Sequence, residues 1–104
     1  MSHEKSPHRW DVKFSRSAEK QYERLKRNGS KPSAADLVNL LIIELRIDGP
    51  YRSNWSNYGQ LQENDFHCHL KKGRPTYVAC WRIVNKIDKR VEVFYVGSHE
   101  NSPY

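Results

Sequence analysis

The second half of the chain holds three strand-like runs joined by connections of hairpin length. Residues 65–71, "DFHCHLK", alternate apolar and polar side chains, while "TYVACWRIV" and "VEVFYVGSH" are rich in β-branched and aromatic residues. The connections "KKGRP" and "NKIDKR" are short, and Asp88 with Lys89 suits a turn. These runs predict an antiparallel three-stranded meander.

A strand and a helix are expected before this meander. In "RWDVKFS", Trp10, Val12 and Phe14 alternate with polar residues, which predicts a half-buried strand. Ser15 can cap a helix through "SAEKQYERLKRNG", which Gly29 would end. The polar side of this helix is strongly basic.

A second helix is predicted from Ser33, which forms a capping box with Asp36, to the helix-ending pair Gly49–Pro50. Its expected core face is wide and carries Leu37, Leu40, Leu41, Leu45 and their neighbours. Residues 50–64 have no clear period and are expected to form a loop, with Trp55 packed inward.

The predicted order is therefore β-α-α-β-β-β, an α+β fold whose antiparallel sheet carries a helical hairpin on one face. The length of 104 residues fits one domain, residues 1–104, in which the polar residues 1–8 are expected to be flexible.

The charge balance indicates a polyanionic partner. Lys and Arg number 18 against 12 Asp and Glu, a net charge of +6, which favours nucleic acid or an acidic protein. Cys68 and Cys80 belong to no ligand ladder and are expected to be buried free thiols. Because no apolar run approaches membrane-span length, we expect a cytoplasmic protein with no membrane partner.

Alternation in residues 65–71 separates a core face from an open face. The core face carries Phe66, Cys68 and Leu70. His67, His69 and Lys71 then point to the open face. Two histidines without a carboxylate or thiol beside them fall short of the three or four ligands of a zinc site, so no metal is expected. An ordinary exposed strand remains an alternative.

A third histidine, His99, follows the last strand in "GSH". If the final strands pair as a meander, His99 lies near the end of the strand that carries His69. Four cationic side chains are expected nearby: Lys71, Lys72, Arg74 and Arg82. Cleavage of RNA through its 2′-hydroxyl requires a base, an acid and positive charge on the phosphate, which two imidazoles and these cations supply without a cofactor. Tyr77, Tyr95 or Tyr104 could stack a splayed base.

The chain resembles the RelE/ParE superfamily of toxins from type II toxin–antitoxin systems. The opening "WDVKFSRSAEKQYERL" is similar to the first strand and helix of that family, and "HCHL" followed by "GSH" resembles the YafQ-type branch of RelE-like mRNA interferases. The resemblance implies a ribosome-dependent endoribonuclease that cleaves mRNA in the A site, and a small acidic antitoxin as partner in a hetero-oligomer.

Carried onto this sequence, the resemblance implies that His69 and His99 are the acid–base pair. Arg82 and Lys71 would assist at the phosphate, and RNA-binding side chains would be His67, Lys72, Arg74 and Tyr104. The hairpin "KKGRP" lacks the acidic residue of YafQ-type toxins. Two alternatives stay open: a ParE-like inhibitor of DNA gyrase, and an RNA-binding homologue without activity.

Overall fold

The computed structural model describes residues 9–27 and 33–104. The predicted flexibility of residues 1–8 and the predicted helix end at Gly29 lie outside these ranges. The elements, in chain order, are β1 (Asp11–Phe14), α1 (Arg16–Leu25), α2 (Ala34–Asp48), β2 (Gly59–Gln62), β3 (Asp65–Lys71), β4 (Tyr77–Asn85), β5 (Arg90–Ser98) and the 3₁₀ turn η1 (His99–Asn101).

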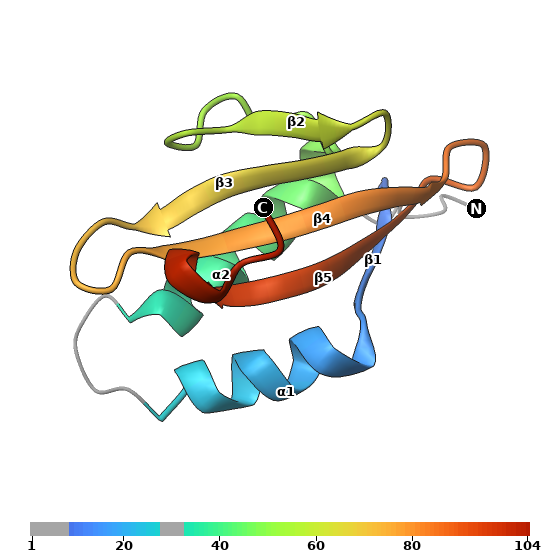
Figure 1. The fold of residues 1–104 in the computed structure, drawn as a ribbon. Coiled ribbons are helices and arrows are strands. Elements are labelled where there is room, and N and C mark those ends of the chain that lie inside the picture. Colours follow the sequence, from blue (N-terminus) through green and yellow to red (C-terminus); the bar gives the residue numbers. More distant parts are fainter. Residues whose placement is uncertain (1–8, 28–32) are drawn as a thin grey trace.

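The strands form one five-stranded sheet in the order β1-β5-β4-β3-β2 (Figure 1). The predicted meander is confirmed, because β3, β4 and β5 pair antiparallel in sequence order. The N-terminal strand β1 pairs parallel with β5, with Val12 opposite Val91. The predicted α+β class is confirmed, but the sheet is mixed and not wholly antiparallel as expected, because β1 runs parallel to β5.

The expectation of a loop over residues 50–64 was wrong for the last part of that segment. Residues Gly59–Gln62 form the edge strand β2, antiparallel to β3, with Gly59 opposite His67. The exposed fraction along β2 alternates only between intermediate and high, because neither face of this edge strand enters the core. A strand held by backbone pairing along one edge therefore leaves little hydrophobic pattern in the sequence.

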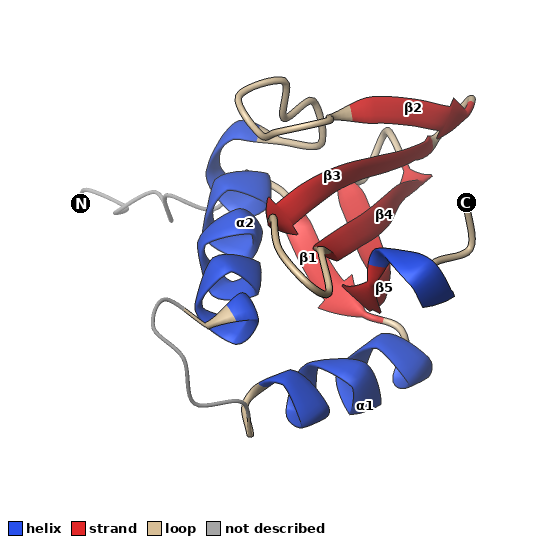
Figure 2. Cartoon of the chain, turned by 60° about the vertical axis from the view of Figure 1, so that its left-hand side comes forward, coloured by secondary structure: helices blue, strands red, loops and turns tan. Residues whose placement is uncertain are grey.

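Helix α2 packs on the sheet face opposite the C-terminal turn η1, and α1 runs below the sheet along β5 (Figure 2). Helix α2 contacts β3, and α1 contacts β5 and α2. Within the described ranges, no helix is long and apolar enough to cross a membrane.

The predicted helix caps are confirmed at both N-termini. The Ala18 N–H donates to Ser15 Oγ at 3.1 Å. Ser33 and Asp36 form the reciprocal capping box, with distances of 3.0 and 3.1 Å. Helix α2 ends before Gly49, as expected, whereas α1 already ends at Leu25 and not at the predicted glycine.

The core face of α2 matches the expected one except at one residue. Leu41 and Leu45 are buried as predicted, as are their neighbours Val38 and Ile42, but Leu40 is 46% exposed. The helix is apolar almost all round between Leu37 and Ile43, so its own period could not select the face that meets the sheet. Packing against β3 decides it.

Two tryptophans fix the connection between α2 and the sheet. Trp81 is fully buried and donates its indole N–H to the carbonyl of Pro50 at 2.9 Å. Trp55 packs inward as expected, against the core, and its indole N–H donates to Glu44 Oε1 at 2.9 Å. Each buried indole N–H thus has a partner, which avoids the cost of an unsatisfied donor.

Candidate functional site

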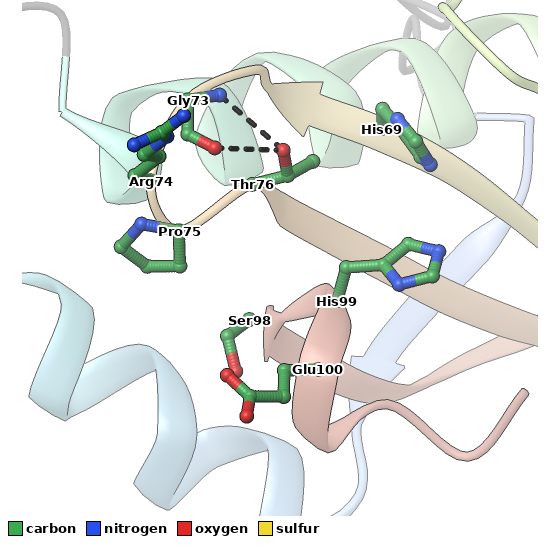
Figure 3. A pocket seen from close by; sticks show the side chains of 8 residues that line it. All are labelled: His69, Gly73, Arg74, Pro75, Thr76, Ser98, His99 and Glu100. Carbon is green, nitrogen blue, oxygen red and sulfur yellow. Dashed lines mark hydrogen bonds between the residues drawn. The ribbon is translucent and has the colours of Figure 1, made fainter.

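An open pocket of about 820 Å³ lies where the β3–β4 turn meets the end of β5 (Figure 3). The residues that line it are His69, Gly73, Arg74, Pro75, Thr76, Ser98, His99 and Glu100. Two segments about 30 positions apart in the sequence therefore face each other across one cavity, and each contributes a histidine.

The structure brings His69 and His99 together. Their ring centroids are 5.3 Å apart, with the planes at 80°. Across the sheet, His69 is opposite Val78, and Val78 is opposite Gly97, so the two outer strands are about 10 Å apart at this level. The turn η1 folds over the sheet directly after β5 and carries the imidazole of His99 across this gap.

Backbone hydrogen bonds hold both histidines in place. The His99 N–H donates to the carbonyl of Thr76 at 2.8 Å, and the His69 N–H donates to the carbonyl of Ser56 at 2.7 Å. Thr76 also closes the hairpin turn, because its hydroxyl donates to the Gly73 carbonyl at 3.0 Å and lies 3.3 Å from the Gly73 N–H. The turn and the strand end are thus tied to one another.

Tyr95 braces the segment that leads to His99. Its hydroxyl donates to the carbonyl of Ser98 at 2.7 Å. To reach it, the hydroxyl passes over Gly97, where a β-carbon would lie only 2.8 Å from Tyr95 Oη. The glycine of the "GSH" sequence is therefore required by a close approach of the tyrosine.

The third histidine, His67, lies beside this pair on the same sheet face. Its ring sits over Gly59, where a β-carbon would be 2.8 Å from His67 Nε2. The ring of Tyr104 lies against it, with centroids 4.2 Å apart, and also contacts His99 at 5.2 Å. The C-terminal residues therefore fold back over the open face, and Cys80, opposite His67, is fully buried there.

Burial and mutual repulsion keep two of these imidazoles from being protonated. Burial, and then the charge of His99 and of Lys72, lowers the pKa of His69. Burial, and then the charges of His69 and His99, lowers the pKa of His67. Burial also raises the pKa of Tyr104 to about 12. At neutral pH His67 and His69 are therefore neutral, and the phenol of Tyr104 keeps its proton.

Arg82 lies apart from His69 and His99, although it was predicted to lie near them. It is opposite Asp65 in the β3–β4 pairing, four residues along β4 from Val78, which is about 13 Å. Its guanidinium stacks on Phe94 at 4.0 Å and is 3.9 Å from Glu92 Oε1, too long for a hydrogen bond. Sharing a sheet face does not bring residues together when the strand is long.

The remaining cations differ in position. Arg74 lines the pocket. Lys71 ends β3 and is opposite Tyr77 after a register shift, and Lys72 is near enough to His69 to lower the pKa of that histidine. Neither lysine lines the pocket.

Five lining residues were not among the predicted site residues: Gly73, Pro75, Thr76, Ser98 and Glu100. Glu100 supplies a carboxylate from η1, whereas the sequence comparison looked for an acid in the hairpin. Its position directly after "GSH" was the available signal.

Within residues 9–27 and 33–104, no group of three or more His, Cys, Asp or Glu side chains is arranged to hold a metal ion. His67, His69 and His99 are near one another: the rings of His69 and His99 are in contact, and the ring of Tyr104 lies against His67 and His99.

No protein-family model and no curated protein matches this sequence. Solved structures do. A metal-bound toxin from Helicobacter pylori superposes with a TM-score of 0.65 at 19% identity, over 88% of this chain and 96% of that chain. The chain therefore has the fold of this toxin.

Two complexes support the same likeness. The YoeB-YefM complex from Staphylococcus aureus matches with a TM-score of 0.63 at 14% identity, over 88% of this chain and 98% of that chain. The archaeal RelE-RelB complex from Pyrococcus horikoshii matches with a TM-score of 0.55 at 13% identity, over 89% and 98%. These identities establish the RelE-like fold alone.

Proposed function

We propose that this chain is the toxin of a toxin–antitoxin pair and that it cleaves mRNA on the ribosome. The observation that carries the proposal is the facing pair His69 and His99 in a pocket that also presents Arg74. A surface that only binds protein has no need of two imidazoles directed at one cavity. The RelE-like fold and the net charge of +6 agree with this function.

In this proposal His69 is the general base. Its lowered pKa leaves a neutral imidazole that takes the proton of the 2′-hydroxyl, whose oxygen then attacks the adjacent phosphorus. His99 is the general acid and donates a proton to the departing 5′-oxygen, so the P–O5′ bond breaks. The products are a 2′,3′-cyclic phosphate and a 5′-hydroxyl end, and no metal or cofactor takes part.

The surrounding groups have supporting roles. Arg74 stabilises the charge that develops on the phosphorane, and Lys71 and Lys72 add positive potential from the end of β3. Glu100, beside His99 in the chain, also lines the pocket.

Binding of the RNA extends from this centre along the sheet. The ring of Tyr104, on His67, offers a surface on which a base can stack. Arg82, about 13 Å away along β4, is placed to contact a more distant phosphate and does not touch the reacting one.

The proposed partner is a small acidic antitoxin. Two of the similar structures are complexes, YoeB with YefM and RelE with RelB. An acidic chain bound to this basic protein in a hetero-oligomer would neutralise its charge and compete with RNA for the same cations.

The test maps mRNA ends after induction of the wild type and of the His69→Ala/His99→Ala variant, on a translated message and on the same message without a start codon. Loss of an acid or a base typically costs about 10²–10⁴-fold in rate. We expect new 5′-hydroxyl ends only with the wild type and only on the translated message. Lys86→Ala, in the exposed β4–β5 turn, is the control.

If the wild type and the His69→Ala/His99→Ala variant both arrest growth without cleaving mRNA, the proposed nuclease activity is refuted. Gyrase supercoiling measured in the same extracts would then test the alternative of a gyrase inhibitor.

A further inference from the structure

A second depression, of about 360 Å³, lies next to the pocket that holds the two histidines. Pro75 and Ser98 line both, so these two residues form a ridge between them. On the far side of the ridge the wall is helix α1, through Arg24 and Leu25. The proposed reaction uses none of the residues beyond the ridge.

The lining of this depression suits a nucleotide. Its floor is apolar, with Leu25 5% exposed and Val96 fully buried, and Tyr77 adds an aromatic ring. Asn101 contributes an amide that can donate and accept hydrogen bonds, as the edges of nucleobases require. The volume lies within the roughly 300–1,000 Å³ of small-molecule sites.

Charge favours a polyanion at the same place. Arg24, in the last turn of α1, is exposed and lines the depression. Exposed Lys20 and Arg27 continue the positive charge on the same helix and just beyond its end. By contrast, the neighbouring pocket contains the carboxylate of Glu100. A phosphate of a strand that leaves the first pocket would therefore be attracted over the ridge towards α1.

The backbone at this place is already satisfied, which argues against an extended peptide. Strand β5 continues beyond the last residue of β1, and an uncovered strand could pair with another chain. Here Gln21 Oε1 accepts the Val96 N–H at 3.0 Å, and the Tyr95 hydroxyl donates to the Ser98 carbonyl at 2.7 Å. Both groups are unavailable for added strand pairing, so recognition must come from side chains, as in single-stranded nucleic acid binding.

We infer that the depression between α1 and the end of β5 is a second subsite, which holds a nucleotide flanking the cleaved bond. The inference rests on the proposed function, because it takes the phosphodiester between His69 and His99 as the reacting bond. It makes α1 part of the RNA-binding surface and gives Arg24 the role of contacting a flanking phosphate.

The experiment measures binding of single-stranded 2′-O-methyl RNA of about eight nucleotides, which cannot be cleaved because it lacks the attacking hydroxyl. Arg24→Gln is compared with Arg16→Gln, the same change of charge about 12 Å away at the start of α1. We expect Arg24→Gln to weaken binding about tenfold and to reduce the slope of log K against log salt by about 0.7, the value for one contact to a single strand. Arg16→Gln should change the slope little.

Amide NMR spectra of the full chain give a second readout. The octanucleotide should shift the Leu25 and Val96 amides, whereas a dinucleotide, which fills only the first pocket, should leave them unchanged. Equal effects of Arg24→Gln and Arg16→Gln, no binding of the octanucleotide, or unshifted amides would overturn the subsite. If Arg24→Gln weakens binding of the antitoxin and leaves RNA binding unchanged, the subsite is also overturned, and the depression belongs to the protein partner.

The proposed function fails separately. If the His69→Ala/His99→Ala variant still cleaves mRNA, the reaction is wrong whatever Arg24 does. If that variant is inactive and Arg24→Gln binds RNA as the wild type does, only the subsite is wrong.

Discussion

The contact between Tyr95 and Gly97 permits a quantitative prediction about the segment that positions His99. Tyr95→Phe removes one hydrogen bond, from the hydroxyl to the Ser98 carbonyl at 2.7 Å, which should cost about 1 kcal/mol of unfolding free energy. Gly97→Ala places a β-carbon 2.8 Å from Tyr95 Oη and 3.1 Å from Cζ, so the ring must move. The hydrogen bond is then lost, and overpacking adds about 1–3 kcal/mol.

The double variant Tyr95→Phe/Gly97→Ala tests whether the two changes act through the same hydrogen bond or independently. Both single changes break the same hydrogen bond, so its loss should be counted once. The double variant should therefore cost about 1 kcal/mol less than the sum of the single costs. Because His99 follows the braced carbonyl directly, mRNA cleavage should also fall in both single variants.

Urea unfolding followed by tryptophan fluorescence supplies these free energies, provided that circular dichroism gives the same midpoints. Ser102→Ala, whose hydroxyl donates to the Tyr104 carbonyl at 3.1 Å, serves as a control for loss of an exposed hydrogen bond. Costs that add to within about 0.5 kcal/mol, or a Gly97→Ala variant as stable as the wild type, would refute the reasoning.

Two further predictions concern buried titratable groups. The pKa of His67 is lowered in the folded chain, so the unfolded chain binds more protons as the pH falls. The contribution of His67 to the free energy of unfolding is therefore complete above about pH 6.5, and it is lost as the pH falls through the lowered pKa. The stability difference between the wild type and His67→Gln should therefore shrink from pH 7.5 to 5 in thermal unfolding, and a constant difference would contradict this. Burial raises the pKa of Cys80 to about 12 and that of Cys68 further, so iodoacetamide at pH 8 should label neither thiol until urea unfolds the chain; labelling of the native protein, read by mass spectrometry, would refute their burial.

Local patterns in the sequence were sufficient for several elements. The alternation of β3 placed Phe66, Cys68 and Leu70 in the core, and their exposed fractions are 1%, 0% and 8%. The capping residues Ser15 and Ser33 marked the helix starts. Such features depend on neighbours within a few residues, so the period and the cap appear directly in the sequence.

Other features depend on contacts between distant segments. The edge strand β2 has little pattern of its own because it is held by pairing with β3. The exposure of Leu40 was not foreseen because α2 is apolar on nearly every side. In both cases the partner, and not the local sequence, selects the outcome.

For the candidate site, the sequence by itself determined the components: two histidines on an open strand face, a third after a glycine bend, and an excess of positive charge. Only the tertiary structure decided which of them meet. The turn after β5 brings His99 to 5.3 Å from His69, Tyr104 folds back onto His67, and Arg82 remains at the other end of its strand. The physical reason is that distance along a strand accumulates at about 3.3 Å per residue, whereas pairing and turns bring remote residues within contact.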